Sequence, residues 1–188
     1  MSRQPCVGED EALVAVGDIP SIDAYSQLGI LPRRKPMLRR SVVHRINCAR
    51  ALLRPPFDLV ILDAYRTLDE QRVLLDHYSL GGPTGRFVAS VEPDAIRPPH
   101  TTGGAVDLTL SWNGKPLGLG TDFDAFIDAA QLHAFEHVEG TIRQLRRILA
   151  GCLLQSGFAT YEIEWWHWSF GDDVWAYANG VPALFEVL

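Results

Sequence analysis

The sequence predicts a single α+β domain in which helices pack on a mostly antiparallel sheet. The chain has 188 residues, of which 47% are hydrophobic. That is enough for one sizeable core, and chains usually divide into domains only beyond about 250 residues. Segments of helical and of strand-like hydrophobic spacing follow one another without an internal repeat or a low-complexity segment, which predicts one mixed domain.

Composition narrows the class of partner. The net charge is −6 and the pI is near 5.4, which argues against general nucleic-acid or anionic-membrane binding and favours small molecules or peptides. Cys6, Cys48 and Cys152 are odd in number and far apart, so they predict neither a disulfide framework nor a Cys-x-x-Cys zinc site. The first residues are acidic and no apolar run reaches 18 residues; we therefore expect a cytoplasmic protein without a membrane anchor.

Residues 1–40 are predicted to be a loop-rich N-terminal segment, and residues 41–188 to form the functional domain. Prolines interrupt the short apolar pieces of this segment and leave no sustained period. Its basic cluster predicts a solvated face, and we assign that cluster no role. The cluster consists of Arg33, Arg34, Lys35, Arg39 and Arg40.

The first half of the domain predicts a helix followed by a strand. Apolar residues recur at helical spacing from Ser41 until Pro55 and Pro56 stop the helix. Residues 57–62 are almost entirely apolar and predict a short buried strand.

Arg66 is predicted to lie at the junction between this strand and a second helix. Thr67 and Glu70 have the spacing of a capping box, which opens a helix that continues to about Tyr78. Side chains at such junctions tend to face a cleft, so Arg66 is a candidate functional residue.

The second half predicts two more strands and a long helix. A Gly/Pro-rich loop over 81–99 is followed by alternation over 105–110, which is typical of a half-buried strand. A helix of about 17 residues is predicted from 139 to Gly157, and the aromatic-rich stretch 161–170 is predicted to be the last major strand. Residues 171–188 show no clear period.

Glu164 and His167 place a carboxylate and an imidazole within an aromatic cluster, where such groups are costly to bury unless they have partners. His100 and Asp107 are separated by two glycines that permit a tight turn. His and Asp ligands with a nearby carboxylate base are typical of zinc hydrolases. Two plain alternatives remain: His167 as a hydrogen-bonded core residue, and Asp107 as a turn cap.

One geometric difficulty and one rival pair accompany this candidate site. On a regular strand, Glu164 and His167 point to opposite faces, so the site requires a bulge or a sharp twist between them. His133 and His137 have the i,i+4 spacing that also suits a metal. They lack an evident third ligand and base, and we interpret them as a solvated feature.

Four motifs occur in order over about residues 57–170, and together they resemble the VanX-like D-alanyl-D-alanine dipeptidases. These are zinc D,D-peptidases related to D,D-carboxypeptidases and to the hedgehog signalling domain. The motifs are Asp63-Ala64-Tyr65-Arg66, His100-x-x-Gly103-x-Ala105-x-Asp107-Leu108-Thr109-Leu110, Gly120-Thr121-Asp122-Phe123-Asp124, and Ser156-Gly157-Phe158 leading into Glu164-Trp165-Trp166-His167.

The resemblance implies that His100, Asp107 and His167 hold Zn²⁺, and that residues 41–188 are the catalytic domain. It implies that Glu164 deprotonates the attacking water and then passes the proton to the leaving amine.

The same resemblance implies roles for three further side chains. Arg66 is expected to stabilise the oxyanion of the tetrahedral intermediate, and Asp124 to hold the free ammonium group of the substrate. Asp63 is expected either to orient Arg66 or to line the substrate pocket, or else only to cap a turn.

The chain departs from the family pattern at two positions: Pro98 replaces a serine and Thr67 replaces a proline. The resemblance implies zinc-dependent hydrolysis of a small dipeptide, with D-alanyl-D-alanine the first candidate. Pro98 argues against that substrate, because the family serine at this position is associated with substrate binding and proline offers no hydrogen-bond donor. The alternatives are a zinc amidase or peptidoglycan carboxypeptidase that acts on a longer peptide, and a noncatalytic zinc-containing binding domain.

Overall fold

The structure is a computed structural model that describes residues 1–79, 89–92 and 95–188. In this part of the chain, five strands form one antiparallel sheet in the order β3-β4-β7-β6, and β5 pairs with β4. The strands are β3 (Phe57–Asp63), β4 (Ala105–Trp112), β5 (Lys115–Pro116), β6 (Ala159–Thr160) and β7 (His167–Ser169). In the N-terminal segment, β1 (Leu13–Ala15) and β2 (Met37–Arg39) form a separate antiparallel pair.

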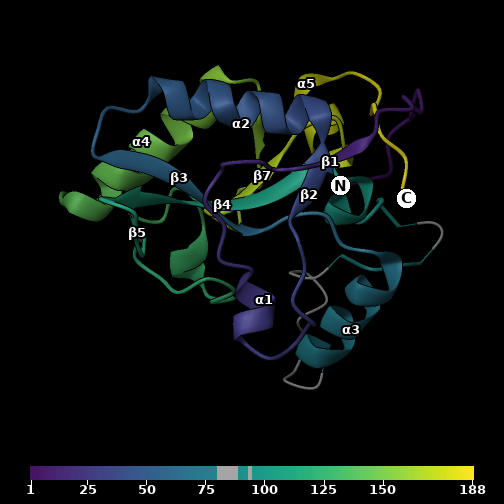
Figure 1. Ribbon diagram of the computed structural model, residues 1–188, viewed down its shortest axis with the longest axis horizontal. Helices are drawn as coiled ribbons and strands as arrows, with labels where there is room; N and C mark the ends of the chain where they lie inside the picture. Colours follow the sequence, from purple (N-terminus) through teal and green to yellow (C-terminus); the bar gives the residue numbers. More distant parts are fainter. Residues whose placement is uncertain (80–88, 93–94) are drawn as a thin grey trace.

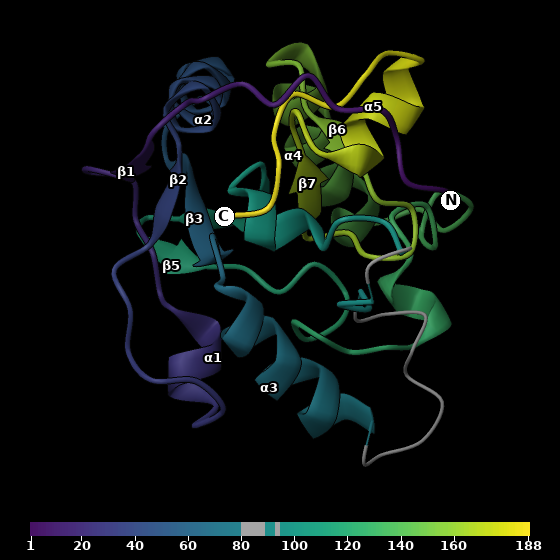
Figure 2. The ribbon, with the colours of Figure 1, turned by 90° about the vertical axis from the view of Figure 1, so that its right-hand side faces the viewer.

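Helices cover both sides of the main sheet, as Figures 1 and 2 show. In both views, α2 (Arg40–Leu52), α4 (Thr141–Gln155) and α5 (Asp173–Asn179) lie above the sheet, and α1 (Ala24–Gln27) and α3 (Leu68–Ser79) lie below it. Two short 3₁₀ helices, η1 (Pro99–Thr102) and η2 (Asp128–Ala130), complete the described elements. The predicted single α+β domain is confirmed.

The main core lies between α2, α4 and the sheet. Val106, Leu108 and Leu110 of β4 face this core, where they are fully buried. They belong to a cluster that includes Val42, Ile46, Val106, Leu108, Leu110, Leu149 and Leu153. Because side chains alternate along a strand, the odd-numbered residues of β4, among them Asp107, face the opposite side, toward α1 and α3.

The predicted capping box at the start of α3 is confirmed. The Thr67 N–H donates to Glu70 Oε2 at 2.8 Å, and the Glu70 N–H donates to Thr67 Oγ1 at 3.2 Å. Threonine therefore serves at this position as a helix cap, which proline cannot do through its side chain.

The predicted strand over 161–170 is wrong over most of its length. Only β7 is extended, and the residues before it form successive turns in which the Glu164 N–H donates to the Tyr161 carbonyl and the His167 N–H to the Glu164 carbonyl. The aromatic residues of this stretch reflect burial rather than an extended backbone: Trp165 and Trp166 are 2% and 1% exposed.

Two other expectations differ from the structure, and a third falls largely on residues that it does not describe. Strand β4 is buried on both faces along nearly its whole length, not half-buried. The C-terminal stretch, in which no period is visible, contains α5. Much of the predicted 81–99 loop lies outside the described residues.

Two residues of the basic cluster in the N-terminal segment, Arg34 and Arg39, are not solvated. Arg39 is 3% exposed and its Nε donates to the Thr102 carbonyl at 2.8 Å, which ties the segment to η1. The side chain of Arg34 is 16% exposed. For these two arginines, the predicted solvated face is wrong. Among the described residues, none of the helices has the length and apolarity that a membrane span requires.

Candidate metal centre and active-site cleft

Neighbouring strands bring Asp107 and His167 together. In the register of the sheet, Asp107 on β4 pairs with Asp63 on β3 and with His167 on β7. The third member, His100, comes from η1, immediately before the turn that leads into β4. A Cβ on Gly104 in that turn would lie 2.5 Å from the Phe170 carbonyl oxygen. Glycine is therefore required there for η1 to pack against the β7 strand end.

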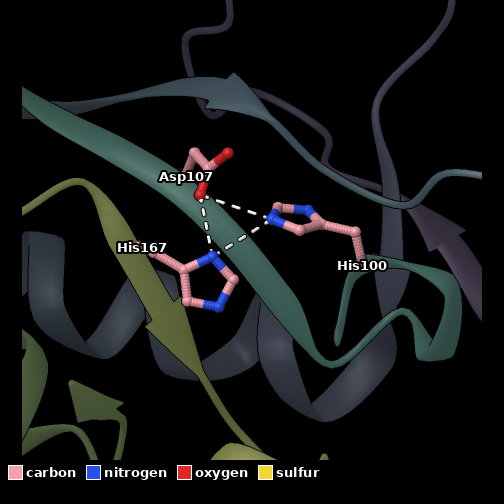
Figure 3. A group of neighbouring side chains, drawn as sticks. All are labelled: His100, Asp107 and His167. Carbon is pink, nitrogen blue, oxygen red and sulfur yellow. Dashed lines mark hydrogen bonds and ion pairs between the residues drawn. The ribbon is translucent and has the colours of Figure 1, made fainter. Parts of the chain in front are cut away.

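His100, Asp107 and His167 point toward one another (Figure 3). Asp107 Oδ1 lies 3.3 Å from His100 Nε2 and 3.2 Å from His167 Nδ1, and the two ring nitrogens are 3.2 Å apart. All three side chains are at most 5% exposed. Among the described residues, this is the group in which three His, Cys, Asp or Glu side chains have the mutual spacing of metal ligands.

The hydrogen atoms of both imidazoles are directed away from this triangle. His100 Nδ1 lies 2.8 Å from the Ala64 carbonyl oxygen, which can only accept, so Nδ1 carries the proton and Nε2 is a lone pair. His167 Nε2 lies 3.2 Å from Ser169 Oγ, a hydroxyl that can accept the Nε2 proton, and Nδ1 is then the lone pair. Two lone pairs and a carboxylate oxygen thus face one another, an arrangement that a cation stabilises.

The size of the triangle fits a tetrahedral ion. Zinc–ligand bonds of about 2.0–2.1 Å in tetrahedral geometry separate neighbouring ligand atoms by about 3.3 Å, close to the three observed separations. Burial alone would raise the pKa of Asp107, but positive charge on His100 and His167, and the hydrogen bonds that they can donate to it, hold it well below its usual range; a bound cation would replace those protons and favour the ionised carboxylate in the same way. Asp107 is therefore an ionised ligand, and three ligands leave a fourth position open.

Glu164 lies in the turn before β7, not on the strand. This turn removes the geometric difficulty of the odd spacing, since the alternation of strand faces does not apply to Glu164. The residue is 7% exposed and lines the same cleft as the triad. Burial, followed by the charges of Asp107 and Asp124, raises the pKa of Glu164 well above its usual range.

The cleft lies between the sheet and the layer formed by α1 and α3. Its volume is about 580 Å³ including its open mouth, within the usual range for small-ligand sites. Part of its lining is polar and part is apolar. The polar part consists of the side chains of His100, Asp107, His167, Arg66, Asp124 and Glu164. The lining residues include Tyr25, Gln71, Leu74, Ile96, Pro99, Phe126, Tyr161, Trp166 and Val174.

Arg66 reaches the cleft from the junction between β3 and α3, as predicted. Its Nε donates to Asp63 Oδ2 at 2.6 Å and its Nη1 donates to Gln71 Oε1 at 3.0 Å. Its Nη2 lies 3.6 Å from Asp107 Oδ2. Asp63 lies behind Arg66 and does not line the cleft, so the geometry favours the orienting role over contact with a substrate.

Asp124 forms a partly buried anionic position elsewhere in the cleft. Its backbone has a φ of 57°, which is uncommon for a residue other than glycine. Tyr78 Oη on α3 donates to Asp124 Oδ2 at 2.6 Å. Burial raises the pKa of Asp124 to about 6, although this hydrogen bond lowers it. A partly buried carboxylate that accepts hydrogen bonds from Tyr78 and Tyr25 can bind a cationic group.

The rival pair His133 and His137 lies on an exposed, turn-rich segment. Neither residue joins a group of three metal-binding side chains among the described residues. Pro98, which replaces the family serine, directs its carbonyl into η1, where it accepts from the Thr101 N–H at 2.9 Å and from Thr101 Oγ1 at 2.7 Å. Pro99, not Pro98, contributes to the cleft wall.

Sequence reasoning missed Tyr25, which α1 of the N-terminal segment brings into the cleft. It is 3% exposed, and its hydroxyl accepts from Arg66 Nη2 at 3.4 Å. The guanidinium carbon of Arg66 lies 5.0 Å from the centre of the Tyr25 ring. No spacing pattern connects Tyr25 to Arg66, because their contact depends on how the N-terminal segment packs under the sheet.

Comparison with known proteins identifies the family to which the chain is similar. A family model described as D-ala-D-ala dipeptidase matches residues 28–184. A D-alanyl-D-alanine dipeptidase of Synechocystis sp. is 28% identical over 214 aligned residues, which cover 93% of this chain and 86% of that protein. The D-alanyl-D-alanine dipeptidase of Enterococcus faecium is 36% identical over 81 residues, or 42% of this chain and 40% of that protein.

Among solved structures, the LD-carboxypeptidase LdcB, whose structure is described in terms of peptidoglycan recognition, aligns with a TM-score of 0.49 and 17% sequence identity. The alignment covers 94% of this chain and 76% of that protein.

Proposed function

The chain belongs to the D-ala-D-ala dipeptidase family of metallopeptidases, and we propose that it uses Zn²⁺ to hydrolyse D-alanyl-D-alanine or a related D-amino-acid dipeptide. The observation that carries this proposal is the triangle of His100, Asp107 and His167, whose lone pairs converge at the spacing of a tetrahedral zinc site. Zinc bound there would supply a Lewis acid that polarises the scissile carbonyl and lowers the pKa of the attacking water.

Glu164 acts as general base and then as general acid. Its carboxylate accepts a proton from the attacking water and later gives that proton to the leaving amine. A raised pKa suits the return of the proton, because a carboxylate of ordinary pKa holds a proton too weakly to deliver it near neutral pH. The charge of a bound Zn²⁺ would favour the ionised form that accepts the proton first.

Arg66 stabilises the negative charge that develops on the carbonyl oxygen. Its Nε donates to Asp63, and each Nη group, which gives one N–H to Gln71 or Tyr25 on the cleft wall, has a second N–H for the oxyanion. A guanidinium group is permanently charged, and its fixed orientation avoids reorganisation when the oxyanion forms.

Asp124 binds the free ammonium group of the dipeptide and thereby sets the position of the scissile bond relative to Glu164 and Arg66. A substrate whose amino group is blocked cannot form this ion pair and would leave the Asp124 carboxylate buried without a cationic partner.

A direct test of this function compares D-Ala-D-Ala with L-Ala-L-Ala, the two mixed isomers, an amino-blocked dipeptide and longer peptides ending in D-Ala-D-Ala. We expect about one zinc per chain by elemental analysis, release of free D-alanine from D-Ala-D-Ala, and little turnover of the amino-blocked substrate. Zinc-loaded protein that hydrolyses none of these peptides contradicts the proposal.

One observation favours a second candidate, a carboxypeptidase acting on a longer peptide. Pro98 offers neither a donor nor a free carbonyl, because its carbonyl is used within η1. If a longer peptide is cleaved faster than the free dipeptide in the same panel, this second function replaces the first.

The pKa of Asp124 predicts how substrate affinity depends on pH. The carboxyl is ionised only above its pKa of about 6, so we expect KM to rise as pH falls below that value, by about tenfold per pH unit. Tyr78→Phe removes the hydrogen bond that lowers this pKa, and the rise in KM then begins at a higher pH.

The measurement is KM against pH for wild type, Tyr78→Phe and the control Tyr177→Phe, which changes a tyrosine that is 60% exposed on α5. A Tyr78→Phe profile that coincides with that of wild type shows that Asp124 does not govern substrate binding.

A further inference from the structure

We propose that Arg34, in the N-terminal segment, is a positioning residue for catalysis: it occupies one oxygen of Asp63 so that Arg66 remains directed into the cleft. The inference rests on the proposed function for the role of Arg66 and adds a residue outside the predicted site.

The Asp63 carboxylate is shared between two guanidinium groups. Arg34 Nη2 donates to Asp63 Oδ1 at 2.5 Å, and Arg66 Nε donates to Asp63 Oδ2 at 2.6 Å. The Asp63 side chain is 1% exposed. Each arginine therefore takes one oxygen of a carboxylate that has almost no access to solvent.

Arg34 also contacts the residue that precedes Arg66 in the chain and a residue in the first turn of α3 that follows it. Its Nη1 donates to the Tyr65 carbonyl at 3.3 Å and to Glu70 Oε2 at 3.4 Å. Arg34 thus contacts residues on both sides of Arg66 in the chain, in the strand end, in the junction and in the capping box of α3.

Asp23 fixes Arg34 in this position. The Arg34 N–H donates to Asp23 Oδ2 at 2.8 Å, and Arg34 Nη2 lies 3.6 Å from Asp23 Oδ1. The chain enters α1 directly after Asp23, and Tyr25 on that helix contacts Arg66 from the cleft side. The N-terminal segment therefore approaches Arg66 from two directions.

Without Arg34, Asp63 Oδ1 would be buried without a partner, which is costly for a charged oxygen. The nearest guanidinium that can satisfy it is Arg66, since carboxylate and guanidinium groups favour two parallel hydrogen bonds. A two-bond pair would engage an Nη of Arg66 and turn it from the cleft. We expect this to reduce stabilisation of the oxyanion while substrate binding through Asp124 remains intact.

The test compares Arg34→Ala, Arg34→Lys and the control Arg33→Ala, which removes a neighbouring exposed arginine. For Arg34→Ala, we expect kcat to fall by about 100-fold, as for a displacement of about 1 Å at a catalytic group, with zinc content and KM unchanged. Arg34→Lys should have a kcat between those of Arg34→Ala and wild type. A lysine ammonium group cannot hydrogen-bond Asp63 and the Tyr65 carbonyl at the same time with the geometry of the planar guanidinium.

Chemical rescue separates positioning from a general loss of structure. Arg34 lines a second cavity of about 250 Å³ on the side of Asp63 away from the cleft. We therefore expect added guanidinium or methylguanidinium ions to restore much of kcat to Arg34→Ala, with no effect on wild type or Arg33→Ala. A kcat for Arg34→Ala equal to that of wild type overturns the inference, as does a deficit that appears only in KM or in zinc content.

A second measurement keeps this inference separate from the proposed function. In ¹⁵N NMR spectra, the side-chain signals of Arg66, assigned by their loss in Arg66→Lys, report its hydrogen bonds directly. In Arg34→Ala we expect an Nη signal of Arg66 to become newly protected and to revert with guanidinium. Unchanged Arg66 signals contradict the inference even if no peptide tested is a substrate.

Discussion

Replacement of Glu164 by glutamine is expected to reduce kcat by about 10³-fold, within the range attributed to general acid–base catalysis, while the zinc content stays near one per chain. Glutamine has almost the same shape but cannot accept the proton of the attacking water. KM should change little, because Glu164 is not the proposed partner of the substrate ammonium. The measurement is steady-state kinetics together with elemental analysis of the same preparation.

Glu162→Gln is the matched control, since Glu162 lies in the same turn and is exposed. The stability of the Glu164→Gln variant gives a second check. The folded chain retains a proton on Glu164, whose pKa is raised, at pH values where the unfolded chain has released it, so stability is lost as pH rises above about 4.3. Metal-free Glu164→Gln should therefore unfold at a higher temperature than metal-free wild type near neutral pH. Full activity in Glu164→Gln excludes the proposed role of Glu164.

Replacement of Asp107 by asparagine is expected to remove zinc binding and with it all measurable hydrolysis. Changes in residues that only support metal ligands cost about 10- to 100-fold in affinity, and loss of the one anionic ligand should cost more. In wild type, free zinc at about 1,000 times its Kd should stabilise the fold by about 4 kcal/mol. In Asp107→Asn this increase in Tm should disappear.

Calorimetry with and without zinc tests this expectation, and Asp58→Asn is its control. Asp58 also lies on the main sheet, but it pairs with Arg50 at 2.8 Å and takes no part in the triangle. A zinc-dependent increase in Tm that survives in Asp107→Asn would place the metal elsewhere in the chain.

The residues of the triangle were predictable from the sequence because a motif fixes their chemical types and order. Their geometry was not. The pairing of Asp107 with His167 depends on a strand register between segments about 60 residues apart, and spacing along the chain does not encode it. The stretch around Glu164 was misinterpreted for a related reason, since its tryptophans indicate burial in a turn as well as they indicate a strand.

The contribution of the N-terminal segment could not be predicted. A run of arginines near prolines usually indicates a solvated surface, and nothing local distinguishes Arg34 from Arg33. What distinguishes them is the buried Asp63 carboxylate, which becomes a neighbour of Arg34 only when the segment folds beneath β3. Sequence patterns therefore carry least information about polar residues whose partners are distant in the chain.

The pairing of Asp107 with His167 across β4 and β7 couples zinc binding to the register of the sheet. A shift of one residue in this pairing would turn the imidazole of His167 to the opposite face and separate it from Asp107. Zinc therefore stabilises the chain in which β7 has docked on β4 in the correct register. Ion binding thus favours one strand register as well as equipping the site for hydrolysis.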